Sequence, residues 1–297
     1  MTNTSLAYEE IIQRFCNWAM EYPEIHGAMV IGSRARTDHP ADEWADLDLI
    51  LLAEDAGRFT SDPSWLQNLG ELLLTFTELS PSGNPERRVL FKGGLDVDIV
   101  PMQPGSLEDL ISAVNQYPER RHELNNFLGR GVRILFDHGG QLTRLVESVC
   151  SPLQANISAH LPTAEEFLNV VNDFWYHTLW TAKHLRRGEL WWAKGGCDGH
   201  LKNLLLTMLM WQAQVNGRDS WFRGRFLEQW ADPIAVHELK TAFGHYDSED
   251  VWQALFSTMH IFEQASTETA ALLEVTLPIS GITATRMLVD QLFAGRD

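Results

Sequence analysis

The sequence has 297 residues, enough for two domains of ordinary size, each with its own core. Its 40 Asp and Glu residues outnumber 23 Lys and Arg residues, which gives a formal net charge of −17. The sequence shows no cluster of basic residues of the kind that binds a nucleic-acid backbone, so we expect no nucleic-acid partner. The sequence shows no signal peptide and no apolar run near the ~20 residues that a membrane helix needs, so we expect a cytoplasmic protein with no membrane partner.

The first half of the sequence predicts an α+β unit, in which short buried strands alternate with helices. In chain order we expect a helix at 6–21, strands at 28–31 and 47–52, a helix around 65–74, strands at 88–91 and 95–100, a helix at 107–114 and a strand at 132–136. Lys92-Gly93-Gly94 predicts a hairpin that joins the strands at 88–91 and 95–100, because glycine readily adopts positive φ. Pro101 is expected to end the second hairpin strand.

The second half predicts a helical bundle. Residues 151–162 carry two prolines and little periodicity, so we divide the chain there, into a catalytic domain at 1–150 and a helical substrate-binding domain at 151–297. Thr163 to Glu166 is a capping-box sequence that opens a helix ending near residue 187. Apolar spacing predicts two further helices, at 201–215 and 251–273.

The segment from Gly32 to Asp48 carries the first group of candidate functional residues. Gly32 and Ser33 stand where a strand stops, and a sharp glycine turn with exposed N–H groups and a hydroxyl suits phosphate oxygens. Asp46 and Asp48 lie two residues apart on a strand, so they project from the same face. Because an unpaired carboxylate is costly to bury among leucines, the pair indicates a hard cation, with Mg²⁺ and a bound triphosphate as the usual candidate.

Asp98 is a third acid, on the strand predicted at 95–100. If that strand neighbours the strand of Asp46 and Asp48, three carboxylates converge as two-metal phosphoryl transfer requires. Asp96 shares the face of Asp98 by its spacing, which leaves the choice of general base between them open. The ordered set of motifs predicts a nucleotidyltransferase of the DNA-polymerase-β type, with a mixed sheet and flanking helices.

These same residues resemble a known family, the aminoglycoside 6-adenylyltransferases (streptomycin adenylyltransferases). The resemblance spans roughly residues 8–260 and is more specific in the first half than in the second. The matching segments are 31–35, 42–48, 90–94, 97–101 and 132–137, followed by 174–175, 182–183, 187–190 and 205–211 in the helical half.

The resemblance implies transfer of AMP from ATP to an aminoglycoside hydroxyl, with Mg²⁺ as cofactor and pyrophosphate as the second product. Asp46 and Asp48 match the metal-binding pair, and Asp98 matches the third acid, which binds metal or takes the acceptor proton. Gly32, Ser33 and Arg34 match the triphosphate loop. Lys202 is expected to reach the triphosphate from the helical domain, although a solvated lysine fits the sequence equally well.

The acceptor is expected to be a cationic small molecule, which an acidic protein attracts. Asp173, Trp175, His177 and Glu189 are the candidate contacts, because acids pair with ammonium groups and an aromatic face stacks on a ring or a cation. Core packing of Trp175 and His177 is the alternative interpretation. The oligomeric state, monomer or homodimer, the preference for ATP over GTP and the modified hydroxyl stay open.

Two other functions remain as alternatives. One is transfer to another small metabolite, such as a lincosamide-like antibiotic, or to a protein hydroxyl; the other is a nucleotide-binding regulator without turnover. The presence of Asp46, Asp48 and Asp98 together argues against the regulator, because a protein that only binds a nucleotide would not need all three acids. Cys197-x-x-His200 has a spacing typical of metal ligands, but no second pair accompanies it, so we expect no zinc there. Cys16, Cys150 and Cys197 are expected to be reduced thiols.

Overall fold

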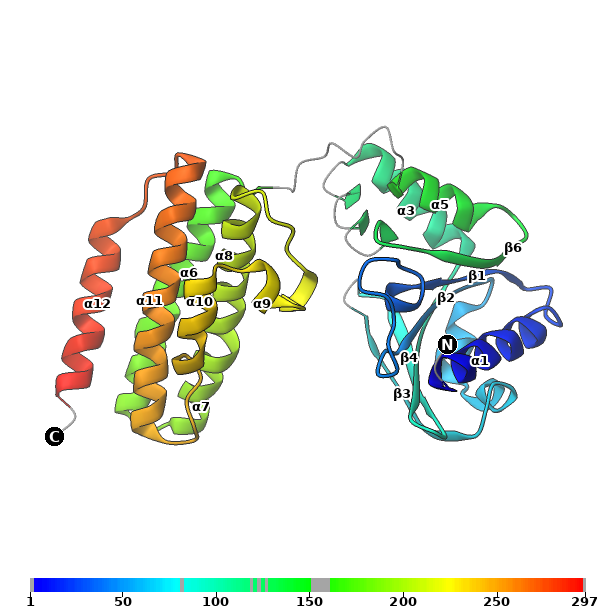
Figure 1. The fold of residues 1–297 in the computed structure, drawn as a ribbon, viewed down its shortest axis with the longest axis horizontal. Coiled ribbons are helices and arrows are strands. Elements are labelled where there is room, and N and C mark those ends of the chain that lie inside the picture. The colour runs from blue at the N-terminus through cyan, green and yellow to red at the C-terminus, as the bar shows by residue number, and fades with distance from the viewer. Residues whose placement is uncertain are drawn as a thin grey trace. The chain divides into compact units, whose positions relative to one another are not determined.

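The computed structural model describes residues 3–80, 83–117, 120–121, 124–125, 128–150 and 161–295. The chain divides into two compact units, Met1–Ile157 and Ser158–Asp297, which are coloured blue to green and green to red in Figure 1. The domain boundary predicted after residue 150 falls at the edge of residues 151–160, which lie outside the described residues.

The first unit is built on a mixed sheet of six strands in the order β3-β4-β5-β2-β1-β6. Strands β2 and β5 are parallel, and all other neighbours are antiparallel. The strands are β1 (Ile25–Ile31), β2 (Leu47–Ala53), β3 (Leu72–Leu79), β4 (Pro85–Phe91), β5 (Leu95–Met102) and β6 (Arg133–Asp137). The predicted α+β class with a mixed sheet and flanking helices is confirmed.

Helices cover both faces of this sheet (Figure 1). Alternate residues of β2 point to opposite faces, so Leu49 packs with α1 (Asn3–Ala19) and α2 (Ala56–Ser61), whereas Leu52 packs with α3 (Pro104–Gln116) and α5 (Gln141–Cys150). Two apolar layers therefore enclose the central strands, and they hold β2 and β5 in a fixed register.

The second unit is helical, as predicted. Three long helices, α6 (Ala164–Arg186), α8 (Lys202–Val215) and α11 (Ser248–Leu273), run side by side, and α12 (Ile279–Ala294) packs against them (Figure 1). Phe174 of α6 stacks on Phe262 of α11 with ring centroids 3.6 Å apart. The shorter helices are α7 (Leu190–Gly195), α9 (Leu227–Trp230) and α10 (Pro233–Glu238), and a π-helix, η4 (Gly196–Leu201), joins α7 to α8.

Two local predictions are wrong. The helix expected around 65–74 is a short 3₁₀-helix, η2 (Ser64–Asn68), followed by the edge strand β3, because pairing with β4 outweighs the helical spacing of a few apolar residues. Pro101 does not end β5 but lies within it, opposite Leu51 of β2. The pairing of β4 with β5 ends at Ile99, so Pro101 has a neighbouring strand, β2, on one side only. Proline lacks an N–H group, and this is tolerated where one side of a strand is unpaired, as on an edge strand.

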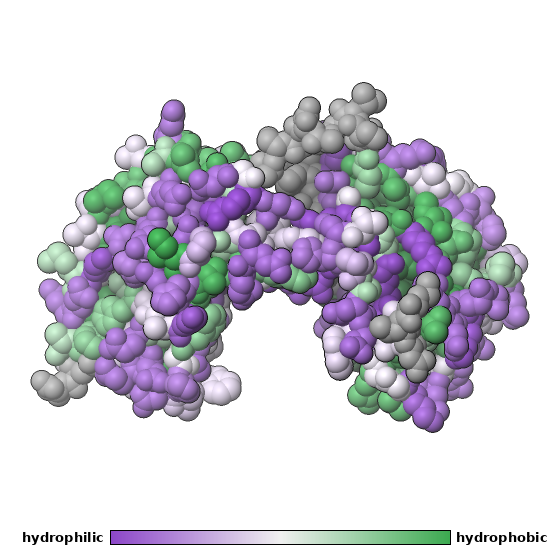
Figure 2. Space-filling view, viewed as in Figure 1, coloured by the Kyte–Doolittle hydropathy of each residue, from purple (hydrophilic) through white to green (hydrophobic). Residues whose placement is uncertain are grey.

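The surface visible in Figure 2 mixes hydrophilic residues with smaller hydrophobic areas on each unit. Within the described ranges, no helix has the length and apolar character to span a bilayer. All three cysteines carry free thiols. The cytoplasmic location expected from the sequence stays a prediction.

The capping box predicted for α6 is present. The Thr163 hydroxyl accepts a hydrogen bond from the Glu166 N–H at 3.2 Å, and the Glu166 carboxylate accepts one from the Thr163 N–H at 2.8 Å. These two bonds satisfy N–H groups that have no partner inside the helix.

Thr163→Ala is expected to lower the free energy of unfolding by about 0.5–2 kcal/mol, because the helix loses its N-cap acceptor. Urea unfolding followed by tryptophan fluorescence measures the loss. Thr163→Ser retains the hydroxyl and serves as the matched control; an equal loss in both variants would exclude the cap as the cause.

Candidate active site

The parallel pairing of β2 and β5 brings three acidic side chains together. Asp48 of β2 lies directly opposite Asp98 of β5, and Asp46 immediately precedes β2. One carboxylate oxygen from each of the three lies within 4.8 Å of the others. Three convergent carboxylates form the all-oxygen ligand set that Mg²⁺ prefers.

Gly32, which follows β1, lies next to the carboxylate of Asp48. Ile31, the last residue of β1, pairs with Asp48, so the chain leaves the strand beside that carboxylate. Gly32 has a φ of +72°, and a Cβ at this position would lie 2.3 Å from Oδ2 of Asp48. The positive φ strongly favours glycine, and any larger residue would also displace the Asp48 carboxylate from its present position.

Ser33 lies in the 3₁₀-turn η1 (Gly32–Arg34) and is only 7% exposed. Among the described residues, its Oγ has no hydrogen-bond partner. Leaving a buried hydroxyl unpaired costs free energy, which a phosphate oxygen of a bound ligand would recover. This hydroxyl follows Gly32, which lies against the Asp48 carboxylate, so it is suited to a phosphate oxygen bound at the same turn.

Arg34 is fixed within the protein. Its Nε donates to the Asp46 carbonyl at 2.9 Å, a second nitrogen donates to the Ala45 carbonyl, and the guanidinium lies 3.5 Å from the centroid of the Tyr8 ring. In this structure Arg34 therefore holds the segment that carries Asp46. Its expected place near the phosphates stays a prediction.

Sequence reasoning missed Arg88, which forms an ion pair with Asp98 from the neighbouring strand β4. Arg88 also lies 3.7 Å from the buried carboxylate of Glu86. The signal was present in the sequence, because the turn at Lys92-Gly93-Gly94 sets Phe91 opposite Leu95, and that register places residue 88 opposite residue 98.

Burial raises the pKa of Asp98 to about 7, and the neighbouring carboxylates of Glu86, Asp46 and Asp96 add to the rise. Arg88 opposes the shift but does not cancel it. A carboxyl group that is 6% exposed and surrounded by other acids is stabilised in its charged form by a divalent cation. The electrostatics of the site thus favour cation binding.

Asp96 is not part of this group. The Tyr8 hydroxyl donates to its Oδ1 at 2.9 Å and accepts from its backbone N–H at 3.2 Å. Burial, together with the bond to Asp96, raises the pKa of Tyr8 to about 12, so the phenol keeps its proton. Of the two candidate bases, the structure brings Asp98 to Asp46 and Asp48, and ties Asp96 to α1.

Lys202 lies in the helical unit and is 9% exposed. Its ammonium donates to Thr258 Oγ1 at 2.6 Å and to the Cys197 carbonyl at 3.3 Å, and Asp198 lies 3.8 Å away. Burial lowers the pKa of this lysine. The structure thus gives it partners within its own unit, and its contact with the triphosphate stays a prediction.

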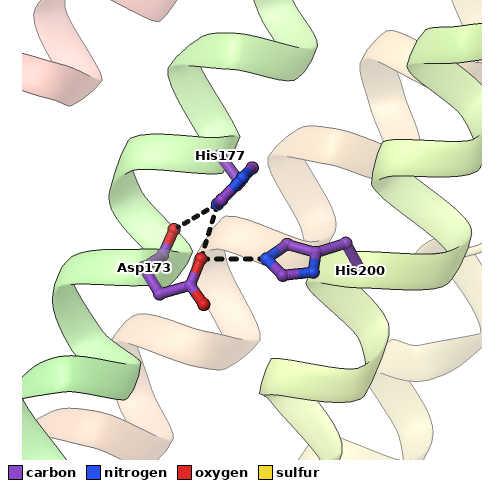
Figure 3. A group of neighbouring side chains, drawn as sticks. All are labelled: Asp173, His177 and His200. Atoms are coloured by element: carbon purple, nitrogen blue, oxygen red, sulfur yellow. Dashed lines mark hydrogen bonds and ion pairs between the residues drawn. The ribbon is translucent and has the colours of Figure 1, made fainter.

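The four candidate acceptor contacts also lie in the helical unit. Asp173 and His177 of α6 meet His200 of η4, a residue that sequence reasoning did not connect with them (Figure 3). Glu189 forms ion pairs with His184 and, at 2.7 Å, with Arg187. Trp175 is 4% exposed and belongs to the core of the unit, so its ring has no open face for stacking.

Comparison with known proteins identifies the family. The family model described as streptomycin adenylyltransferase matches residues 7–286. The chain is 23% identical over 282 residues to an aminoglycoside 6-adenylyltransferase of Campylobacter jejuni, with 91% of each chain covered. It is also 23% identical over 264 residues to one of Bacillus subtilis (strain 168), with 87% of this chain and 88% of that protein covered.

Among solved structures, the chain is similar to the aminoglycoside 6-adenyltransferase from Bacillus subtilis, with a TM-score of 0.44 and 16% identity. That alignment covers 95% of this chain and 97% of the other. The match to the family extends through both units and includes all three acids of the sheet. The chain therefore belongs to the streptomycin adenylyltransferase family and is a nucleotidyltransferase.

Proposed function

We propose that this enzyme transfers AMP from ATP to a hydroxyl of an aminoglycoside, with streptomycin as the first acceptor to test, and releases pyrophosphate. The observation that carries the proposal is the group of three carboxylates within 4.8 Å, formed by Asp46, Asp48 and Asp98. The named activities of the relatives support aminoglycosides as the acceptor class.

Asp46, Asp48 and Asp98 would hold two Mg²⁺ ions. Bound there, they would supply charge neutralisation for the triphosphate and Lewis-acid polarisation of the reacting oxygens. Gly32 lets the Asp48 carboxylate lie against the backbone at the end of β1, and the Ser33 hydroxyl in the same turn would donate to a triphosphate oxygen. By bracing the backbone of Ala45 and Asp46, Arg34 keeps the ligand geometry fixed before ATP binds.

Asp98 acts as the general base in this proposal. The acceptor hydroxyl oxygen forms a bond to the α-phosphorus, the bond from that phosphorus to the bridging oxygen breaks, and pyrophosphate leaves with the bonding electrons. The hydroxyl proton passes to the Asp98 carboxylate. Bound Mg²⁺ would oppose the rise in pKa that burial causes in the metal-free protein, so Asp98 would be ionised and able to accept the proton when the acceptor binds.

The acceptor contacts are proposed from the helical unit. Asp173 and Glu189 present partly exposed carboxylates for the ammonium or guanidinium groups of an aminoglycoside, and His177 lies beside Asp173. Trp175 is 4% exposed and packs in the core of the same unit, so it is not proposed as a direct contact. Lys202 is proposed as a triphosphate contact that exchanges its present partners for phosphate when substrates bind.

The direct test is pyrophosphate release from ATP and Mg²⁺ across a panel of aminoglycosides, with GTP as an alternative donor. Acceptor-dependent release with an aminoglycoside supports the proposal. Release only with another acceptor would replace the proposed substrate class, and tight ATP binding without release for any acceptor would indicate a regulator.

Asp48→Asn is expected to abolish detectable pyrophosphate release, because the variant removes one charge from the metal ligands. Far-ultraviolet circular dichroism should be unchanged, since the replacement keeps the size of the side chain. Substantial residual turnover in the folded variant would remove Asp48 from the metal site.

Asp98→Asn is expected to lower kcat by ~10² to 10⁴, the usual contribution of a general base. The matched control is Asp96→Asn on the same strand, where the lost partner is the Tyr8 hydroxyl. Steady-state kinetics of both variants decide between the two acids. A larger loss at Asp96 than at Asp98 would assign the base to Asp96 instead.

Mg²⁺ affinity is expected to rise with pH up to about 7 and then level off. Between about pH 4 and pH 7 the metal-free folded protein keeps a proton on Asp98 that the unfolded chain has lost, so the free energy of unfolding falls as pH rises over this window. Because Mg²⁺ must displace that proton, its affinity is expected to rise by ~10-fold per pH unit at pH values below the pKa of Asp98.

Titration calorimetry with Mg²⁺ at about pH 6 and about pH 8 measures this dependence, with Asp98→Asn as the control that removes the titrating group. The variant should bind more weakly, with an affinity that no longer follows pH. A flat profile in the unchanged protein would contradict the coupling between proton and metal.

A further inference from the structure

We propose that the helical unit carries a second metal site, which binds a transition ion of the Zn²⁺ class through Asp173, His177 and His200. This three-residue group is named the α6–η4 triad after the two elements that supply it (Figure 3). The site is separate from the three carboxylates of the sheet and differs from them in ligand chemistry.

The three ligand atoms already converge on one point. Oδ1 of Asp173 lies 2.5 Å from Nδ1 of His177 and 2.9 Å from Nε2 of His200. All three ligand atoms lie within 4.8 Å of one another, and the two imidazole centroids are 4.1 Å apart. Figure 3 shows both rings directing a nitrogen at the same carboxylate oxygen.

The backbone holds this arrangement before any ion binds. Asp173 and His177 are four residues apart on α6, so they share one face of a long helix. His200 lies in the π-helix η4, and π-helical turns are frequently found at functional sites. Cys197 and Leu201, on either side of His200, are fully buried in the core and anchor the turn.

Gly196 explains how η4 approaches α6 closely enough for the three side chains to meet. A Cβ at this position would lie 2.8 Å from Cζ3 of Trp180 and 2.9 Å from Oγ1 of Thr181, both on α6. Any larger residue would require a shift of the π-helix or of these two side chains. The close approach and the triad are therefore parts of one local arrangement.

The donor set selects the type of ion. Imidazole nitrogens suit Zn²⁺, Cu²⁺, Ni²⁺ and Fe²⁺, whereas Mg²⁺ and Ca²⁺ prefer oxygen ligands. Two histidines with one carboxylate leave further coordination positions for water or a substrate atom. The side chains of Asp173, His177 and His200 are 31%, 35% and 43% exposed, so an ion can enter from solvent.

The shift needed for binding is small. Metal–ligand bonds of ~2.0–2.1 Å in a tetrahedral site separate the ligand atoms by roughly 3.3 Å. The present contacts of 2.5 and 2.9 Å would therefore widen by less than ~1 Å, which side-chain rotation supplies. With neutral imidazoles the triad carries a single negative charge, which a divalent cation more than balances.

Asp173 and His177 also appear in the proposed acceptor contacts, but the two proposals are separable. Metal binding is expected without ATP or acceptor, so it stands whether or not the protein adenylylates an aminoglycoside. Failure of acceptor turnover with intact Zn²⁺ binding would overturn only the proposed function.

The test is calorimetric titration of the full, untagged chain with Zn²⁺, in millimolar Mg²⁺ to occupy the carboxylates of the sheet. We expect one Zn²⁺ per chain whose affinity falls by at least ~10-fold in His177→Ala and in His200→Ala. The matched control is His260→Ala, an exposed histidine on α11 of the same unit, which should bind as the unchanged protein does. Asp48→Asn should likewise retain Zn²⁺ binding.

Co²⁺ provides a second readout, because its visible absorption reports nitrogen ligation and low coordination number. The unchanged protein should show these bands and lose them on addition of Zn²⁺, and the folded His200→Ala variant should show weaker bands. His177→Gln, checked by circular dichroism, replaces the alanine variant if that variant does not fold. Absence of stoichiometric Zn²⁺ binding, or equal affinity in the triad variants and the control, would overturn the proposal.

Discussion

The parallel pairing of β2 with β5 is the constraint on which the candidate active site depends. It sets Asp48 opposite Asp98 and brings two carboxyl groups together in a partly buried place, which favours a bound proton or a bound cation between them. Apolar layers on both faces of the sheet hold this register against the repulsion. The packing of the core thus keeps three acidic side chains close together in spite of their mutual electrostatic repulsion.

The negative charge of the three acids is balanced partly by the protein, and the remainder is available to bound cations. Arg88 neutralises part of the charge on Asp98, yet burial still raises the pKa of that group to about 7. Gly32 lets the Asp48 carboxylate approach the backbone closely, and the Ser33 hydroxyl, which has no hydrogen-bond partner among the described residues, lies in the same turn. These features make the site receptive to cations and phosphate oxygens, which is consistent with a nucleotidyltransferase of the streptomycin adenylyltransferase family.

The two units offer different metal chemistry. Among the residues that the structure describes, the group of Asp46, Asp48 and Asp98 offers carboxylate oxygens, whereas the α6–η4 triad combines one carboxylate with two imidazoles. Asp48 and Asp98 meet across the paired strands β2 and β5, whereas Asp173 and His177 share one face of α6 and meet His200 of η4. The same difference allows experiments to address one set of ligands in the presence of the other.

Local patterns in the sequence determined several helices of this protein and the register of one hairpin. Periodicity and capping located α1, α6 and α11, and the hairpin turn at Lys92-Gly93-Gly94 already contained the register of Arg88 with Asp98. Edge strand β3, the continuation of β5 through Pro101, and the meeting of His200 with Asp173 were decided only by the tertiary structure. Helix caps and tight turns depend on neighbouring residues, so a sequence displays them. Strand pairing and the approach of η4 to α6 depend on packing between segments far apart in the chain, which no local pattern records.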